Sequence, residues 1–378
     1  MPFSPPDAGL TNWIEGFRPR AAAAGISGPT FDAAFREVGL STFVIEKDRN
    51  QAEFSKTIWD YLDSVASDQR IADGRAALAA NAGLLDEIEA TYGVEKAVVV
   101  AVWGLESNYG TKRGNVHTIE ALATLAYEGR RATFFEQQLI AALKILQNGD
   151  VAPDKMVGSW AGAMGHTQFI PTSYLAFAVD FRGDGRRDIW AEDPTDALAS
   201  TAAYLAKSGW TRGQPWGVEV ILPAGFNIGL TGKGIRRPTG DWAAMGVRAA
   251  SGGIVPDYGA ASIILPAGAK GAAFMIFSNF TAITRYNAAD AYVIGVGHLS
   301  DRIVGRPAIR TPWPRDPNAL DLNGRIRMQD LLTRRGFDTQ GTDGLIGPNT
   351  TAAITAFQIS VGVVPDGYPS TDLLALLQ

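Results

Sequence analysis

One carboxylate in this chain lies where a carboxyl group could act as an acid. Glu106 ends an apolar run, residues 97–105, and is followed by Ser107 and Asn108. Burial beside Trp103 and the valines of the run would make its ionisation costly and raise its pKa by desolvation. A carboxyl group that stays protonated near neutral pH can serve as a general acid. Cleavage of a glycosidic bond needs one, because the leaving sugar oxygen must be protonated. A solvated glutamate on a helix surface is the alternative interpretation.

Four blocks of residues favour the enzymatic interpretation. They are Trp103 to Gly110; Arg130-Arg131 with Phe134-Phe135; the run Gly-Ser-Trp-Ala-Gly-Ala-Met-Gly at 158–165 with Gln168-Phe169; and Thr284-Arg285-Tyr286-Asn287. Through these blocks, about residues 10–300 of the chain resemble the membrane-bound lytic murein transglycosylase B family of bacterial cell-wall enzymes. The order and spacing of the blocks make this resemblance highly specific.

The resemblance implies an enzyme with a lysozyme-like helical core. It would cleave the β-1,4 bond between N-acetylmuramic acid and N-acetylglucosamine in peptidoglycan, without a cofactor. Glu106 would be the single general acid and base. It would protonate the leaving oxygen and then take the proton of the C6 hydroxyl, which attacks C1 and closes a 1,6-anhydro ring. The N-acetyl oxygen of the substrate would stabilise the charge at C1. Because peptidoglycan lies outside the cytoplasmic membrane, we expect a periplasmic protein.

The number of carboxylates separates this reaction from hydrolysis. A glycosidase ordinarily needs two carboxylates, and no second Asp or Glu of this chain lies in a comparable apolar motif. A well-oriented internal hydroxyl has an effective molarity of roughly 10⁵–10⁸ M, so it outcompetes bulk water. Two alternatives stay open. One is a muramidase that uses water, with Asp180 or another acid as second carboxylate, and the other is a peptidoglycan-binding scaffold without activity.

Polar and aromatic residues that could hold a sugar are spread along the chain. Ser107 binds either the substrate's acetamido group or Glu106, or it caps the end of a helix. Glycines near Gln168 would let the backbone approach a ligand, with the amide directed at sugar hydroxyls or at Glu106. Tyrosine offers a flat face to a sugar ring and a hydroxyl for hydrogen bonding. The resemblance implies substrate contacts at Tyr286, Asn287 and Tyr292 and, more weakly, at Tyr61 and Tyr204.

An acidic, glycine-rich loop follows the third block, where some members of the resembled family carry a calcium loop of EF-hand type. The residues at its first, third, fifth, sixth, ninth and twelfth positions are Asp180, Arg182, Asp184, Gly185, Asp188 and Ala191. Arg182 and Ala191 stand where a calcium loop needs oxygen ligands. We therefore predict no metal at this degenerate loop, and expect Arg182 or Arg186 to neutralise its aspartates.

Composition excludes several other classes of protein. The chain has 378 residues, 46% hydrophobic and 19% charged, which is typical of a globular protein of two or three domains. A net charge of −5 disfavours nucleic acid and anionic membranes as partners. There is no cysteine, and the three histidines show no metal-ligand spacing. No apolar stretch reaches the ~20 residues of a transmembrane helix. The chain does not start as a signal peptide, so we expect that an export signal has been removed.

Hydrophobic periodicity predicts a mainly α (α+β) fold. Helices are expected over residues 94–105, 133–147, 196–207 and 284–305. The first of them is apolar on nearly all sides and should be buried. Short strands are expected over residues 218–222, 262–265 and 272–277, within a small β element inserted at about 215–282. Together these elements form a predicted catalytic region, residues 1–305.

A linker and a second domain are predicted beyond this region. Four prolines, at positions 307, 312, 314 and 317, make residues 306–317 a stiff, extended connector. Residues 318–378 indicate three helices, the second and third starting after the N-caps Thr350 and Thr371, with Val361 buried. Asp343-Gly344 and Phe357-Gln358 give this unit its resemblance to the three-helix peptidoglycan-binding domain. We therefore expect a monomer that binds peptidoglycan strands, and the sequence does not identify any protein partners from cell-wall synthesis or hydrolysis.

Overall fold

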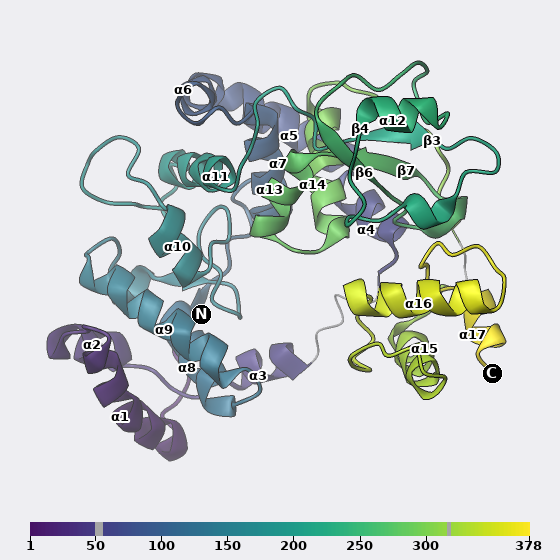
Figure 1. Ribbon diagram of the computed structural model, residues 1–378. Coiled ribbons are helices and arrows are strands. Elements are labelled where there is room, and N and C mark those ends of the chain that lie inside the picture. The colour runs from purple at the N-terminus through teal and green to yellow at the C-terminus, as the bar shows by residue number, and fades with distance from the viewer. Residues whose placement is uncertain (50–55, 316–318) are drawn as a thin grey trace. The chain divides into compact units, whose positions relative to one another are not determined.

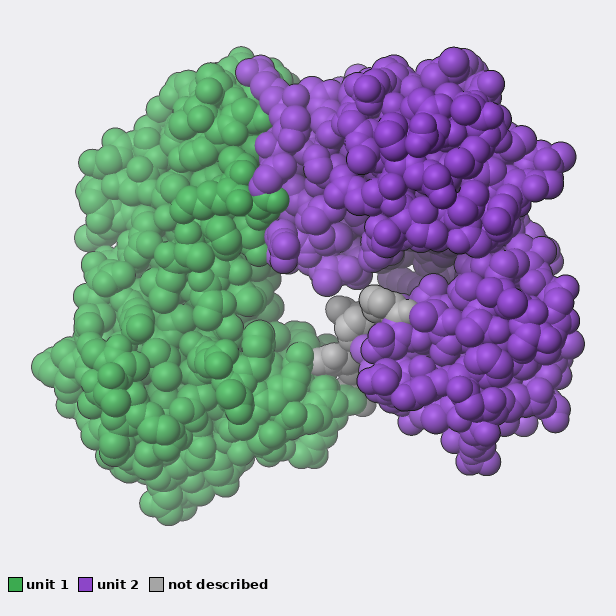
Figure 2. Space-filling view, viewed as in Figure 1, with its two compact units in different colours: residues 1–51, 69–208 green, residues 52–68, 209–378 purple. Residues whose placement is uncertain are grey.

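The computed structural model describes residues 1–49, 56–315 and 319–378, which divide into two compact units. Unit 1 comprises residues 1–51 and 69–208, and unit 2 comprises residues 52–68 and 209–378 (Figure 2). Helices make up most of unit 1, whereas unit 2 combines helices with a small β-sheet (Figure 1). The predicted mainly α (α+β) fold class is confirmed. Over the described ranges, no helix has the length and apolar character needed to cross a membrane.

Unit 1 consists of helices and one two-stranded ribbon. The helices are α1 (Ala8–Ala23), α2 (Gly28–Phe35), α3 (Thr42–Arg49), α5 (Asp68–Ala80), α6 (Ala82–Tyr92), α7 (Lys96–Ser107), α8 (Thr118–Glu128), α9 (Ala132–Gln147), α10 (Pro171–Phe177) and α11 (Thr195–Lys207), with a 3₁₀ turn, η2, at Pro153–Lys155. Strand β1 (Val116–His117) pairs antiparallel with β2 (Val157–Gly158). Helices α8 and α9 pack against each other, and α11 packs on α6 and α7.

The predicted helices of unit 1 are confirmed. Helix α7 covers most of residues 94–105, and it is buried on almost every side because its residues are valine, alanine and tryptophan. Helices α9 and α11 match the other two predictions. Gly149 and Gly209 follow them with φ of 79° and 93°. This left-handed conformation, which glycine adopts without steric cost, ends both helices.

The sheet of unit 2 has five antiparallel strands in the order β4-β6-β7-β3-β5. They are β3 (Gly217–Ile221), β4 (Arg237–Pro238), β5 (Arg248–Ala249), β6 (Ala260–Ile264) and β7 (Ala273–Ile276). The three predicted strands correspond to β3, β6 and β7, while the two-residue edge strands β4 and β5 are too short to give a pattern. One face of the sheet packs on Trp242 of α12 (Thr239–Ala244), which is fully buried with Ile263 and Met275.

Helices α4 (Ile58–Val65), α13 (Ser278–Tyr286) and α14 (Asp290–Ile303) also belong to unit 2, and α4 packs on α14. Two further 3₁₀ turns are η3 (Ile228–Leu230) and η4 (Gly268–Lys270). The prediction of helix over 284–305 is confirmed for the end of α13 and for α14, but the helix breaks between them at residues 287–289. Asn287 has extended backbone (φ −148°, ψ 125°), and its Oδ1 accepts the N–H of Ala289 at 3.0 Å. An asparagine side chain that bonds the backbone two residues on favours a turn over a helix.

The C-terminal part of unit 2 contains the three expected helices, α15 (Leu322–Arg334), α16 (Pro348–Ser360) and α17 (Thr371–Leu376), around a core that includes Leu332 and Phe357. Both predicted N-caps are wrong. Helix α16 begins at Pro348 after Gly347, because proline has no N–H to leave unpaired in the first turn. The hydroxyl of Thr350 instead accepts a hydrogen bond from Gln329 Nε2 at 3.1 Å. Ser370 caps α17.

Val361 lies beyond α16 and is 41% exposed, so its predicted burial is also wrong.

The compact units are divided at other points of the chain than the predicted domains. The division into a catalytic region (1–305), a linker (306–317) and a peptidoglycan-binding domain (318–378) therefore stays a prediction.

The proline-rich connector is attached to the sheet in unit 2. The two carboxylate oxygens of Glu219, on β3, accept the backbone N–H groups of Arg310 and Thr311 at 2.8 and 2.7 Å. Arg315 forms two hydrogen bonds to Asp63, at 2.8 and 3.1 Å. Pro317, the last residue of the predicted linker, lies outside the described residues. The connector is therefore bound at residues 310, 311 and 315 as well as stiffened by proline.

A half-buried histidine makes unit 2 sensitive to acid. Burial, together with the neighbouring Arg302, lowers the pKa of His298, on α14, from 6.5 to about 4, while Glu219 acts in the opposite direction. Below pH 6.5 the unfolded chain binds a proton that the folded chain does not, so stability falls as the pH drops from 6.5 to about 4. At about 1.4 kcal/mol per pKa unit, this amounts to about 3 kcal/mol.

We expect the variant His298→Gln to lack that part of the acid sensitivity. Urea unfolding at pH 7 and pH 4.5 should give a smaller difference in the free energy of unfolding for the variant than for the wild type. Equal differences would show that His298 is already protonated in the folded protein. Because the wild type and the variant share all other titrating groups, comparing their changes between the same two pH values cancels the contributions of those groups.

Candidate active site

Glu106 lies in the last turn of α7, at the point where the helix emerges from the core of unit 1. Residues 97–104 of α7 are all buried, whereas Glu106 is half-buried. The chain then leaves the helix through three consecutive left-handed residues, Asn108, Tyr109 and Gly110, with φ of 51°, 57° and 84°. Such a conformation costs roughly 1–2 kcal/mol for each non-glycine residue, so the surroundings must hold it in place.

Tyr109 and Arg70 hold this left-handed turn, residues 108–110, which we call the exit turn. The hydroxyl of Tyr109 donates to the backbone oxygen of Arg70 at 2.7 Å, and Arg70 Nη1 donates to the backbone oxygen of Gly104 at 2.5 Å. Burial raises the pKa of Tyr109, so its phenol stays a neutral donor. A Cβ at Gly104 would lie 2.7 Å from the Tyr109 ring, which explains the glycine beside Trp103 in the first block.

Ser107 faces the core of unit 1. The residue is 1% exposed, its hydroxyl donates to the backbone oxygen of His166 at 2.5 Å, and it accepts the N–H of Gly110 at 2.9 Å. Of the alternatives left open by the sequence, this geometry favours the helix-ending role. A substrate contact by Ser107 stays a prediction that these bonds do not support.

The glycine-rich block around residues 158–165 brings a second loop to the end of α7. A Cβ at Gly158 would collide with the backbone oxygen of Ala163, and one at Gly165 with that of Ile189. Gln168, left-handed at φ 53°, donates from Nε2 to the backbone oxygens of Arg113 at 3.0 Å and Gly165 at 2.8 Å. Both amide N–H groups are thereby used, so a ligand would meet Gln168 at its carbonyl oxygen.

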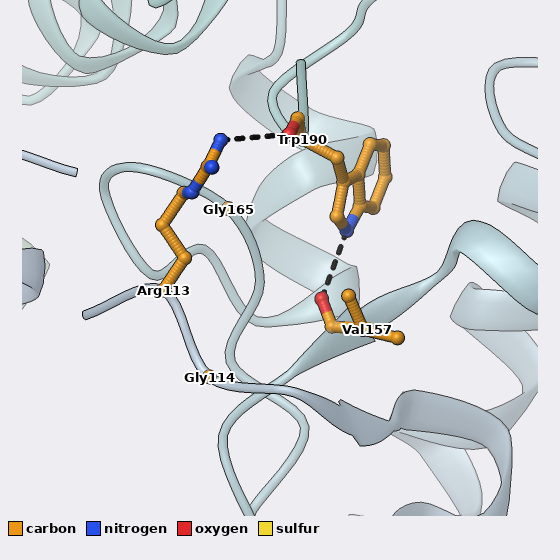
Figure 3. Close-up of a pocket in the computed structure, with 5 residues that line it drawn as sticks. All are labelled: Arg113, Gly114, Val157, Gly165 and Trp190. Atoms are coloured by element: carbon orange, nitrogen blue, oxygen red, sulfur yellow. Dashed lines mark hydrogen bonds between the residues drawn. The ribbon is translucent and has the colours of Figure 1, made fainter. Parts of the chain in front are cut away.

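A cavity of about 140 Å³ lies beside these loops, lined by Arg113, Gly114, Val157, Gly165 and Trp190 (Figure 3). Arg113 Nη1 donates to the backbone oxygen of Trp190 at 3.0 Å, and the indole of Trp190 donates to that of Val157 at 3.1 Å. Arg113 also pairs with the exposed Glu192. The guanidinium is therefore held mainly by backbone carbonyls.

The other predicted sugar-binding residues belong to two separate groups. Unit 1 contains Tyr204, on α11, which is 8% exposed and stacks on Phe177 at 3.9 Å between ring centroids. Unit 2 contains Tyr61 on α4, Tyr286 at the end of α13, Asn287 after it, and Tyr292 on α14. The rings of Tyr286 and Tyr292 lie nearly parallel with centroids 6.4 Å apart. Their contacts with substrate stay predictions.

The loop after residue 180 is organised by its own hydrogen bonds. Asp180 accepts the N–H groups of Gly183, Asp184 and Gly185, and these bonds lower its pKa. Arg182 pairs with Glu87 on α6, and neutralisation of the aspartates by Arg182 or Arg186 stays a prediction. Within the described ranges no three acidic or histidine side chains are grouped as a metal ion would need. With Arg182 and Ala191 at two ligand positions, the loop departs from the calcium-binding pattern, and the absence of a metal stays a prediction.

Sequence reasoning missed three residues that fix this site, namely Arg70, Arg113 and His166. The hydrogen-bond partners of their side chains are 25 to 79 positions away in the chain, so no local motif could reveal them. The one available signal was the clustering of His166 with Gly165 and Gln168 inside the third block.

The fold and this site define the class of protein. Residues 9–301 match the family described as the transglycosylase SLT domain, and residues 322–377 match the putative peptidoglycan binding domain. The chain therefore belongs to the transglycosylase SLT family, and the family predicted from the sequence is confirmed.

The chain is similar to several characterised members. It is 33% identical, over 220 residues, to membrane-bound lytic murein transglycosylase B of Escherichia coli strain K12, an alignment that covers 56% of this chain and 58% of that protein. SltB3 from Pseudomonas aeruginosa, in complex with NAG-NAM-pentapeptide, has a TM-score of 0.93 and 49% identity, covering 98% of this chain and 100% of the other. A lytic transglycosylase of Escherichia coli in complex with calcium has a TM-score of 0.66 and 26% identity, over 79% and 93% of the two chains.

The close approach at Gly104 predicts the effect of one added methyl group. We expect Gly104→Ala to lower the free energy of unfolding by about 1–3 kcal/mol, because its Cβ would overlap the Tyr109 ring. Gly83→Ala, in α6, is the matched control, since no atom lies within 4 Å of its Cβ position. Thermal unfolding of both variants measures the difference, and equal midpoints would show that the exit turn can yield.

The mismatch at two loop positions predicts how calcium binding could be restored. The wild-type protein should give no binding heat with calcium in titration calorimetry. The double variant Arg182→Asp and Ala191→Glu supplies oxygen ligands at the third and twelfth positions and should bind calcium with a Kd of roughly 10⁻⁴–10⁻³ M. Micromolar binding by the wild type would contradict this account of the loop.

Proposed function

We propose that the chain is a lytic transglycosylase that cleaves the β-1,4 bond between N-acetylmuramic acid and N-acetylglucosamine in peptidoglycan, and leaves 1,6-anhydromuramic acid ends. The observation that carries this proposal is the position of Glu106, a half-buried carboxyl group at the end of the buried helix α7 within the first family block. Its place of action would be the periplasm, where the substrate lies.

Glu106 would serve in both halves of the reaction. As a carboxylic acid it gives its proton to the glycosidic oxygen, which leaves as the hydroxyl of N-acetylglucosamine while positive charge develops at C1 of the muramic acid. As a carboxylate it then takes the proton of the C6 hydroxyl, whose oxygen bonds to C1. The proton returns to Glu106, so the cycle consumes no water. The N-acetyl oxygen of the substrate would support the charge at C1.

The state of Asp180 favours this reaction over hydrolysis. A muramidase that uses water would need a second carboxylate as base or nucleophile. Both oxygens of Asp180 accept backbone N–H groups of its own loop, and the lowered pKa makes it a weaker base. The complex of SltB3 with NAG-anhNAM-pentapeptide shows that a relative 49% identical binds an anhydro sugar. This supports the same product here.

The match of residues 322–377 to a peptidoglycan-binding domain supports binding of glycan strands by the C-terminal helices. We propose that Gln168, through its carbonyl oxygen, and Tyr286, Asn287, Tyr292, Tyr61 and Tyr204 contact the sugar chain, as the resemblance implies.

Digestion of purified sacculi tests the reaction. Mass spectrometry of the soluble muropeptides should show products one water lighter than reducing muropeptides. The variant Glu106→Gln should lose about 10²–10⁴-fold in rate, because proton transfer is removed. It should still sediment with sacculi. The same change at the exposed Glu46 of α3 is the matched control and should leave the rate unchanged.

Two results would contradict the proposal. Reducing products would identify a hydrolase, and the search for a second carboxylate would begin with the acids of the loop after residue 180. The absence of products from the wild type, with normal sedimentation, would favour a binding scaffold.

A further inference from the structure

A single residue fastens both sides of the helical turn that carries Glu106. The indole N–H of Trp103 donates to His166 Nδ1 at 3.2 Å, and the hydroxyl of Ser107 donates to the backbone oxygen of His166 at 2.5 Å. On the far side of the ring, Nε2 lies 2.7 Å from the backbone oxygen of Ala191. His166 is 3% exposed, so these contacts are shielded from water.

The partners of the imidazole fix its protonation state. The indole nitrogen of Trp103 can only donate and the backbone oxygen of Ala191 can only accept, so the ring must be neutral with its proton on Nε2. A second proton on Nδ1 would place two N–H donors against each other and break the bond to Trp103. Arg113 Nη1 lies 3.2 Å from Nε2 but donates its two hydrogens to the backbone oxygens of Trp190 and Ala191, so it does not require Nε2 as an acceptor, and its charge opposes a charge on the ring.

Burial lowers the pKa of His166, which keeps the ring neutral at pH 7. The charged groups that face it are Arg113, which lowers this pKa further, and Glu192 and Asp193, which raise it slightly. Because Glu192 pairs with Arg113, the three charges largely compensate one another.

The contacts of His166 with Trp103 and Ser107 lie beside the carboxyl group that carries out the proposed reaction. Trp103 and Ser107 are four residues apart, and Glu106 lies between them in the final turn of α7. The last turn of a helix lacks its full set of backbone bonds and frays most easily. His166 connects that turn to the loop containing Ala191, whose backbone oxygen also accepts Arg113 Nη1 at 2.9 Å.

We propose that His166 is a positioning residue, whose neutral ring holds Trp103 and thereby fixes the last turn of α7 and the Glu106 carboxyl group in the orientation that the reaction needs. This proposal rests on the proposed function of Glu106. His166 does not transfer a proton to the substrate, because both ring nitrogens are engaged inside the protein.

Two amide substitutions separate the two ring contacts. The side-chain oxygen of His166→Asn reaches the place of Nδ1 and can accept the Trp103 N–H, whereas the amide nitrogen of His166→Gln reaches the place of Nε2 and can donate to Ala191. On short soluble glycans, we expect His166→Gln to lower kcat about 10–100-fold, because a small misplacement of a catalytic group can cost up to about 10²-fold in rate. The KM of this variant should stay within about twofold of the wild-type value. The variant His166→Asn should keep a kcat within about threefold of the wild-type value.

Two further measurements keep the test independent of folding. Trp103→Phe removes the same hydrogen bond, so combining it with His166→Gln should cause no additional loss of kcat. In the wild type, kcat should fall at acidic pH with an inflection below pH 6.5 that His166→Asn lacks. The ¹⁵N imidazole spectrum, assigned with that variant, should show the proton of His166 on Nε2.

The outcomes distinguish this proposal from the proposed function. Equal losses in both amide variants, or a proton on Nδ1 in the spectrum, would overturn the positioning role. So would normal activity of His166→Gln, while inactivity of Glu106→Gln in the same assay would leave the proposed function intact. If the wild type forms no anhydro products, the proposed function fails, and the spectrum still reports the state of His166.

Discussion

A buried helix end leaves backbone carbonyl groups without partners in the helix, and unit 1 is arranged around meeting this requirement at the end of α7. The oxygen of Trp103 accepts the N–H of Tyr109, and that of Gly104 accepts Asn108 N–H and the guanidinium of Arg70. Each bond demands a particular path for the chain beyond the helix, which is why three left-handed residues follow one another. The position of Glu106 is a consequence of this path.

The sequence predicted the parts of the site that depend on local order. An apolar run ending in a carboxylate defines α7 and Glu106, because burial and helical period act over a few residues. The supporting bonds could not be predicted in this way. Arg113 and Ala191 are 78 positions apart, and Trp103 and His166 are 63 apart, so only the tertiary fold brings them together. Polar loop residues have no period that would indicate their partners.

The same reasoning explains which parts of the fold were predicted. Strands β3, β6 and β7 and the helices around them bury apolar side chains in a regular pattern. The break between α13 and α14, in contrast, depends on one side-chain bond from Asn287 to the backbone. The connector was expected to act by stiffness alone, yet Glu219 binds two of its N–H groups. Arg315 and Asp63 are both more than half exposed, so their ion pair is screened by water and contributes little to stability.

Rigidity near Glu106 has a chemical purpose if the sugar's own hydroxyl is to react in place of water. The advantage of an internal nucleophile, roughly 10⁵–10⁸ M in effective concentration, exists only while the acid and the reacting atoms keep their alignment. A carboxyl group on a frayed helix end would lose that alignment and admit solvent as a competitor. Neutral bonds suit this task better than ion pairs, because Trp103, His166 and Ser107 lie in a buried region where unpaired charge is costly. The frame around Glu106 is accordingly built from backbone carbonyls, an indole, a hydroxyl and a neutral imidazole, together with the Arg70 guanidinium, which bonds a backbone carbonyl.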